Sequence, residues 1–77
     1  MLYGESRIDG EFSGWTGSGV YPLVNGQYWK QASYKYKYKY KYRPKARIWR
    51  DGSRYYLESE GMDSMIRVRR VYSLDED

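Results

Sequence analysis

Length and composition limit this chain to one small domain and exclude several kinds of site. Its 77 residues include no histidine and no cysteine. Disulfide bonds, Ser-His-Asp and Cys-His catalytic arrangements and the usual zinc sites are therefore impossible. No run of about 18 apolar residues could span a membrane, and the first residues lack the features of a signal peptide. We expect a cytoplasmic protein that uses no cofactor, holds no metal and binds no membrane.

Basic charge is concentrated in the middle of the chain. The formal charge of the whole chain is +4, whereas residues 34–54 carry nine Lys and Arg against the single carboxylate of Asp51, a net charge of +8. The flanking segments are therefore acidic. A middle segment of this charge would attract a polyanion or the acidic end of a second copy.

Alternation of polar and apolar residues predicts an all-β chain. Period-two stretches separated by turn residues indicate six or seven short, mostly antiparallel strands. They cover residues 7–13, 20–24, 27–31, 34–42, 45–50, 54–60 and 65–71. So many short strands in so few residues favour a small barrel of the SH3-like or OB-like type, in which one long strand bends to serve both sheets.

Glycine and proline mark the turns between these strands. Asn25-Gly26 favours a two-residue type I′ hairpin turn, and Asp51-Gly52 is a second hairpin signal. Pro22 has no backbone donor, so its strand is expected at a sheet edge or with a bulge. A kink is expected at Arg43-Pro44, where the long strand ends, and a bulge at Arg70, where the alternation of the last strand slips.

A single domain is expected over residues 7–72. Residues 1–6 are predicted to be frayed, and residues 73–77 form an acidic tail that is predicted to be disordered. Aromatic residues make up 19% of the chain, which implies a core of a few large rings. The residues predicted to face inward are Ile8, Phe12, Trp15, Trp29, Ala46, Ile48, Tyr55 and Leu57.

The most regular stretch of the chain alternates tyrosine and lysine. As a strand it would span about 30 Å and would place the tyrosines on one face and the lysines on the other. With three residues of the next segment it forms the candidate binding surface. This surface consists of Tyr34, Lys35, Tyr36, Lys37, Tyr38, Lys39, Tyr40, Lys41, Tyr42, Lys45, Arg47 and Trp49.

Three hypotheses for this surface remain open. In a purely structural role the tyrosines pack half-inside, while the lysines stay wet and discourage edge-to-edge strand pairing. In a nucleic-acid-binding role the rings stack on single-stranded bases and the cations neutralise phosphates, although alternation separates the two onto opposite faces. In a protein-interaction role the tyrosines offer rigid contact area to another protein or to a second copy, which would give a homo-oligomer. Of the two binding hypotheses, protein interaction leads and single-stranded nucleic acid is close behind.

Two other features are weak signals of chemistry. Glu58 and Glu60 stand two residues apart on one strand face, about 7 Å by the strand rise, as the paired carboxylates of a glycosidase could. A chain this short leaves little room for the cleft that would raise the pKa of one of them. The glycine-dense loop over residues 14–19 lacks the Gly-Lys-Ser/Thr ending of a phosphate-binding loop. We therefore do not expect an enzyme.

One short motif carries a resemblance. Residues 25–31 read Asn-Gly-Gln-Tyr-Trp-Lys-Gln, and the aromatic alternating strand and a closing Tyr-x-Leu-x-x-x-Gly segment follow. This pattern resembles a small bacterial β-domain with the motif Asn-Gly-Gln-x-Trp-x-Gln, found alone or attached to larger proteins of unassigned function. The resemblance extends over residues 7–71 and implies an all-β fold and a bacterial origin. It implies no activity and no binding residues.

Overall fold

The computed structural model describes residues 1–73, and their regular structure consists of eight β-strands. The strands are β1 (Leu2–Arg7), β2 (Glu11–Thr16), β3 (Val20–Pro22), β4 (Tyr28–Gln31), β5 (Tyr36–Tyr42), β6 (Lys45–Asp51), β7 (Arg54–Ser59) and β8 (Ile66–Val71). The all-β prediction is therefore confirmed. Over the same residues, no helix is long and apolar enough to cross a membrane.

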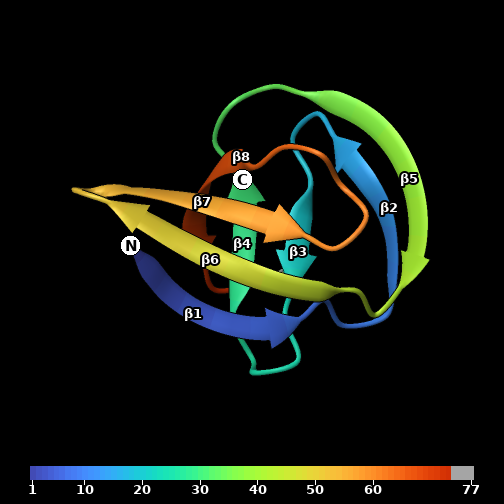
Figure 1. Ribbon diagram of the computed structural model, residues 1–77, viewed down its shortest axis with the longest axis horizontal. Helices are drawn as coiled ribbons and strands as arrows, with labels where there is room; N and C mark the ends of the chain where they lie inside the picture. The colour runs from blue at the N-terminus through green and yellow to red at the C-terminus, as the bar shows by residue number, and fades with distance from the viewer. Residues whose placement is uncertain (74–77) are drawn as a thin grey trace.

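The strands form two antiparallel sheets. The larger sheet has the order β1-β6-β7-β8-β4-β3, and the smaller sheet contains β2 and β5 alone. Figure 1 shows β5 at the outer rim of the molecule, with β2 between it and the larger sheet. The edge strands β1 and β3 meet only at an isolated bridge between Ile8 and Leu23, so the described residues form no closed barrel.

The first residues differ from the prediction. Residues 1–6, expected to be frayed, lie mostly in β1, which pairs with β6 along its length. The ammonium group of Met1 donates to the Arg50 carbonyl at 3.1 Å. Side-chain alternation could not predict this strand, because backbone pairing with the edge of β6 holds it and its side chains are mainly exposed. The first strand predicted over residues 7–13 is divided in the structure, because β1 ends at Arg7 and β2 begins at Glu11.

The first predicted hairpin turn forms, but with a different loop. The Asn25-Gly26 hairpin is confirmed, but its loop is longer than a type I′ turn. Leu23 N–H donates to the Gln27 carbonyl at 2.7 Å, which closes a three-residue loop. Gly26 has a φ of 92°, whereas Asn25 does not have the positive φ that a type I′ turn requires.

Three further predicted features have different outcomes. The hairpin at Asp51-Gly52 is confirmed, because Asp51 pairs with Arg54 across a two-residue loop. The burial pattern of β8 slips as expected, with Val71 buried and Arg70 exposed. No bulge causes the slip, since the ladder between β4 and β8 runs without a register shift. Pro22 lies in the edge strand β3, as its missing donor predicted.

The core lies between the two sheets and is rich in aromatic rings. It consists of Ile8, Phe12, Trp15, Tyr21, Leu23, Trp29, Ala46, Ile48, Leu57, Ile66 and Val68, with Tyr55 packed against it. Every residue predicted to face inward therefore does so. The acidic tail expected over residues 73–77 lies, apart from Ser73, outside the described residues.

A buried glutamine ties the start of β5 to this core. The Gln31 Oε1 atom accepts hydrogen bonds from the Thr16 N–H at 2.9 Å and from the Tyr21 hydroxyl at 2.6 Å. Its Nε2 group donates to the Lys35 carbonyl at 3.1 Å. Because both ends of a buried amide need partners, this side chain holds the chain that enters β5 against β2 and β3.

Gly14 determines how β2 faces the core. Phe12 and Trp15 are both buried although they are an odd number of residues apart, which regular alternation does not allow. The register between β2 and β5 shifts between Phe12 and Gly14, and Gly14 has a φ of 89°. A Cβ at Gly14 would overlap the Lys37 carbonyl oxygen and lie 2.7 Å from the Lys39 nitrogen. The position therefore requires glycine both for its conformation and for its space.

Gly14→Ala should destabilise the protein far more than Gly26→Ala. The two glycines have nearly the same positive φ, but a Cβ at Gly26 meets nothing within 4 Å. Gly26→Ala should cost about 1 kcal/mol of unfolding free energy through its conformation alone. Gly14→Ala should cost about 2 kcal/mol more, because the backbone of β5 must move. Denaturant titration measures both, and equal losses would contradict the role given to Gly14.

Candidate functional site

Cross-strand pairing shows which way each side chain of β5 points. Side chains directly opposite each other in an antiparallel pair share one face of the sheet. Lys41 lies opposite Phe12 and Lys37 lies opposite Trp15, and both of these partners are buried in the core. The lysines therefore project from the core side of the sheet, and the tyrosines project from the outer side.

The four tyrosines of β5 consequently face solvent in a row, and together with the exposed Tyr34 just before the strand we call them the tyrosine face. Their relative exposures are 82% for Tyr34, 68% for Tyr36, 67% for Tyr38, 48% for Tyr40 and 68% for Tyr42. The separation of rings and ammonium groups onto opposite faces is confirmed. The expectation that these tyrosines pack half-inside is wrong, because β2 supplies the large rings that fill the core at this point.

Three of the lysines reach toward the loop between β7 and β8, although most of them stay exposed. The Lys37 ammonium lies 2.9 Å from the Asp63 carboxylate, and the Lys35 ammonium donates to the Ser64 hydroxyl at 2.7 Å. The stem of Lys41 packs beside Gly61. A Lys side chain can cover apolar surface with its stem while its charge stays hydrated. The lysine row thus closes the open side of the small sheet against this loop.

These contacts lower the pKa values of two carboxyl groups. The hydrogen bond from Lys37 holds the pKa of the Asp63 carboxyl below its ordinary value, and the positive charge of Lys37 adds to this effect. The pKa of Glu60 is lowered because its carboxylate accepts a hydrogen bond from the Lys45 backbone N–H. Both residues are exposed, so solvent screens these interactions. Neither group has the raised pKa that an acid catalyst needs.

Among residues 1–73, one ionised side chain forms a hydrogen bond with the tyrosine face. The Tyr40 hydroxyl donates to the Glu11 carboxylate at 3.1 Å, and this hydrogen bond raises the pKa of Tyr40. Glu11 stands on β2, opposite Tyr42. The charge beside the rings is therefore negative, while the lysines of the same strand lie on the other side of the sheet.

The remaining predicted site residues lie in β6, in the other sheet. The Arg47 guanidinium lies 5.8 Å from the centre of the Trp49 ring and 3.0 Å from the Glu58 carboxylate. The Trp49 Nε1–H donates to that same carboxylate at 2.9 Å. Trp49 therefore lies beside a cation, but its side chain is only partly exposed. Lys45, Arg47 and Trp49 do not continue the row of β5, so the candidate surface divides into two.

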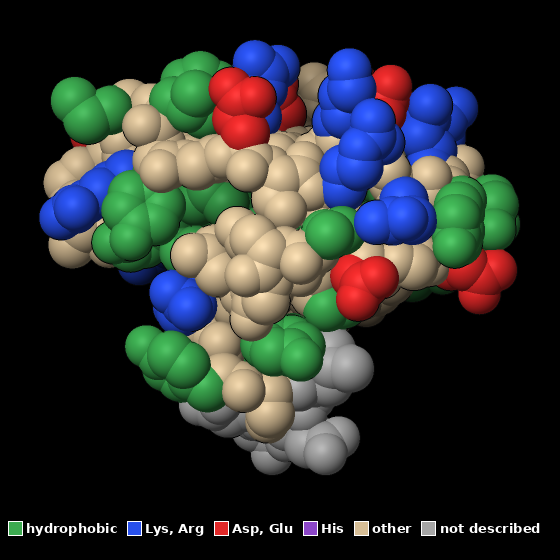
Figure 2. Space-filling model, turned by 90° about the horizontal axis from the view of Figure 1, so that it is seen from below, with side chains coloured by type: hydrophobic (Ala, Val, Ile, Leu, Met, Phe, Trp, Pro, Cys, Tyr) green, Lys and Arg blue, Asp and Glu red, His purple; other side chains and the backbone are tan. Residues whose placement is uncertain are grey.

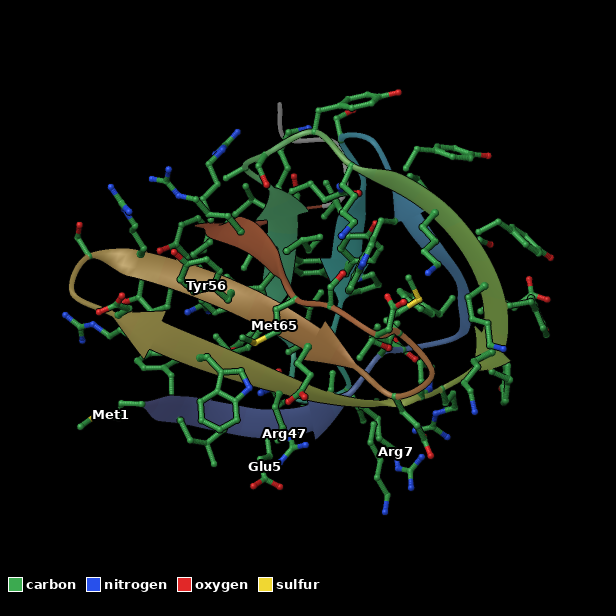
Figure 3. The ribbon with its side chains drawn as sticks, turned by 45° about the horizontal axis from the view of Figure 1, so that its top comes forward. Met1, Glu5, Arg7, Arg47, Tyr56 and Met65 are labelled. Atoms are coloured by element: carbon green, nitrogen blue, oxygen red, sulfur yellow. The ribbon has the colours of Figure 1, made fainter. Side chains whose placement is uncertain are left out.

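The surface around Trp49 carries a small hollow. Its volume is about 320 Å³, and it is lined by Met1, Trp49, Arg50, Asp51, Tyr56 and Met65. Figure 3 shows Tyr56 and Met65 over β6 and β7, with Met1 beside the start of β1 and with Arg47 and Glu5 below. Sequence patterns missed this hollow because strand pairing, and not sequence spacing, brings Met1 and Tyr56 to Trp49.

Charges of both signs surround this region. Seen from below, Lys and Arg side chains gather toward one side of the molecule, with Asp and Glu side chains among them (Figure 2). Arg47 lies between Glu5 and Glu58 in the register of the larger sheet. A second groove, of about 470 Å³, runs past these three residues. Its lining is mixed in charge and offers a polyanion no uniformly basic track.

Comparison with known protein families, with curated protein sequences and with solved structures finds no match to this chain. The resemblance carried by residues 25–31 therefore stays an expectation. Among residues 1–73, no group of three or more carboxylates could hold a metal ion. What the chain does must be argued from its own surface.

Lys37→Met should raise the pKa of Asp63 toward its ordinary value. The hydrogen bond from Lys37 is the largest cause of the lowered pKa, so its loss removes most of the shift. NMR titration of the Asp63 side-chain carboxyl measures this change. Lys39→Met is the matched control. Lys39 points to the same side of β5 as Lys37, but it is not among the groups that shift the Asp63 pKa. An unchanged Asp63 pKa in Lys37→Met would show that the lysines do not reach the loop.

Proposed function

We propose that this protein is a non-enzymatic interaction module that binds other protein chains through the tyrosine face of β5, either a different protein or a further copy of itself. The observation that carries the proposal is the row of four exposed rings on β5, with the exposed ring of Tyr34 just before the strand. A large exposed apolar row is informative where isolated exposed apolar residues are not, because soluble domains avoid contiguous patches of this kind.

The chemistry of tyrosine supports protein as the ligand. A tyrosine ring presents a large apolar area and a hydroxyl, and few rotatable bonds lose freedom when it is bound. Rings at alternate positions of a strand stand about 7 Å apart, which suits the side chains of an apposed sheet or an extended chain. Tyrosine is enriched at protein interfaces and among the residues that contribute most to binding.

Single-stranded nucleic acid is the weaker proposal. Such ligands need cations and rings on the same side of a strand, because the phosphates lie within a few ångströms of the bases. The lysines of β5 point to the core side, and Lys37 is already paired with Asp63. The charge on the tyrosine side is the carboxylate of Glu11. A purely structural role gives no reason for five exposed rings, which would stabilise the fold more if they were buried.

We also infer that the larger sheet is a nearly closed barrel of the SH3-like or OB-like type. The support is the bridge between Ile8 and Leu23, which joins the two edge strands. Flanking it, Val24 N–H donates to the Arg7 carbonyl at 2.8 Å, and Asp9 N–H donates to the Pro22 carbonyl at 2.8 Å. In such a barrel the small sheet would form a flap that displays the tyrosine face.

Site-specific photo-crosslinking in cells that express the protein tests the proposed function. A benzophenone amino acid replaces Tyr38, and in a control variant it replaces Val24, which is 47% exposed on the β3–β4 hairpin. The probe at position 38 should form discrete protein adducts, either with a second copy or with another chain. The probe at position 24 should form few.

Two outcomes would contradict the proposal. Adducts that disappear after nuclease treatment but not after protease treatment would favour the nucleic-acid alternative. Equal adduct yields at positions 38 and 24 would mean that the tyrosine face is an ordinary exposed surface. Adding Tyr36→Ala to the position-38 variant provides a further check, since removal of a neighbouring ring should reduce the protein adducts several-fold.

A further inference from the structure

We propose that a partner protein adds an extended, antiparallel strand to the free edge of β5, and that this strand carries acidic side chains at alternate positions. The inference rests on the proposed function and names the partner's chemistry. Strand addition at a sheet edge is a recurring mode of peptide recognition, in which the main chain supplies affinity and alternate side chains supply specificity.

The edge of β5 that faces away from β2 is unpaired. The smaller sheet contains two strands, so each has one edge that no described strand covers. Figure 1 shows β5 as the outermost strand on its side of the molecule, with no strand drawn beyond it. An unpaired edge presents a row of backbone donors and acceptors that another chain can use.

The hydrogen bonds to β2 show that the backbone N–H and C=O groups of the tyrosines, and not of the lysines, face the free edge of β5. At one end, Gly17 N–H donates to the Lys35 carbonyl, and at the other, Arg43 N–H donates to the Gly10 carbonyl, both at 2.9 Å. Between them, the Lys37 carbonyl oxygen and the Lys39 nitrogen lie beside Gly14. Backbone groups of successive residues in a strand point to opposite edges, so the odd-numbered residues face β2.

The N–H and C=O groups of Tyr36, Tyr38 and Tyr42 therefore face the free edge, and Tyr40 shares their phase. A strand added here would form its hydrogen-bonded pairs with tyrosines and would place its own side chains beside the exposed rings. The lysines would occupy the non-hydrogen-bonded pairs, where opposing Cα atoms come within about 4.5 Å. One added strand would therefore bind both the free edge of β5, through its backbone, and the tyrosine face, through its side chains.

This phase argues against a second copy of β5 as the added strand. In an antiparallel pair, a residue whose backbone groups face the partner strand must lie opposite another such residue. Two antiparallel copies of β5 would therefore set tyrosine opposite tyrosine and lysine opposite lysine. Like charges directly opposite each other destabilise a sheet, and here they would meet in the closer type of pair. Charge repulsion between the lysines therefore disfavours pairing of two copies of β5, as charged residues on edge strands commonly do.

The same lysines select a partner of opposite charge. The Lys39 ammonium makes no hydrogen bond or ion pair with any described residue, and its position in the middle of β5 would place it opposite the centre of an added strand. A glutamate or aspartate opposite Lys39 or Lys41 would form a cross-strand ion pair, which is favourable. The residues that alternate with these acids would contact the tyrosine face and should be apolar.

A set of synthetic peptides tests the inference. The probe is a labelled, end-capped peptide of sequence Glu-Val-Glu-Val-Glu-Val-Glu, and its affinity is measured by fluorescence anisotropy. Replacing each Glu with Lys should weaken binding at least about tenfold, because the lysine row then meets like charge. N-methylation of the valines, whose amides would face β5, should abolish binding. N-methylation of the glutamates, whose amides would face solvent, should leave most of it.

Backbone amide hydrogen exchange on the protein distinguishes binding at the free edge of β5 from binding at the tyrosine rings alone. Saturating peptide should slow exchange of the Tyr38 and Tyr40 amides at least about tenfold, while the Lys37 and Lys41 amides, already facing β2, should change little. Shifted tyrosine ring signals with unchanged Tyr38 and Tyr40 exchange would overturn strand addition but leave the tyrosine face as the binding site. If no peptide of the set binds at about 1 mM, strand addition by an acidic strand is wrong, and the photo-crosslinking result at position 38 stands independently.

Discussion

Burial of Phe12 and Trp15 on the same side of β2 determines the surface that this molecule presents. Each ring lies opposite a lysine of β5, so their burial turns the lysines toward the core side and the tyrosines toward solvent. The arrangement requires the left-handed conformation of Gly14, since regular alternation would expose one of the two rings. The candidate binding surface therefore depends on a glycine that is not part of it.

The lysines show how one side chain can serve two purposes. Their stems cover the inner side of the small sheet, and the ammonium groups of Lys35 and Lys37 bind Ser64 and Asp63 in the loop between β7 and β8. Exposed ion pairs contribute little stability individually, so the value of these contacts lies in placing the loop and in keeping charge away from the tyrosine face. That separation favours an apolar or hydrogen-bonding ligand on the outer side.

Much of the fold follows from period-two patterns and turn residues. The strands that contain Ala46, Ile48 and Leu57 alternate as amphipathic strands do, and the structure buries these residues. The hairpins at Asn25-Gly26 and Asp51-Gly52 were also predictable, because glycine allows conformations that other residues avoid. β1 was not predictable, since its pairing with β6 uses backbone groups and leaves little pattern in its side chains.

Which face of β5 points toward the core could not be predicted, for a different reason. Tyrosine and lysine are both amphipathic, so a strand that alternates them has two faces of similar character and no side-chain rule decides which one is buried. The register of β2 decides it, and that register depends on a conformation of Gly14 that sequence spacing does not reveal. The hollow around Trp49 was missed because it is lined by residues of β6 and β7 together with Met1 and Met65, which are far apart in the sequence.

The most direct test is the solvent accessibility of individual tyrosine rings, measured by photochemically induced nuclear polarisation NMR on dilute protein. Dye molecules polarise only those rings that they can touch. Tyr36, Tyr38 and Tyr42 should give strong signals, whereas Tyr21, which is 6% exposed and bonded to Gln31, should give none. Silent rings along β5 would mean that the strand faces the other way, and the proposed interaction surface would then not exist.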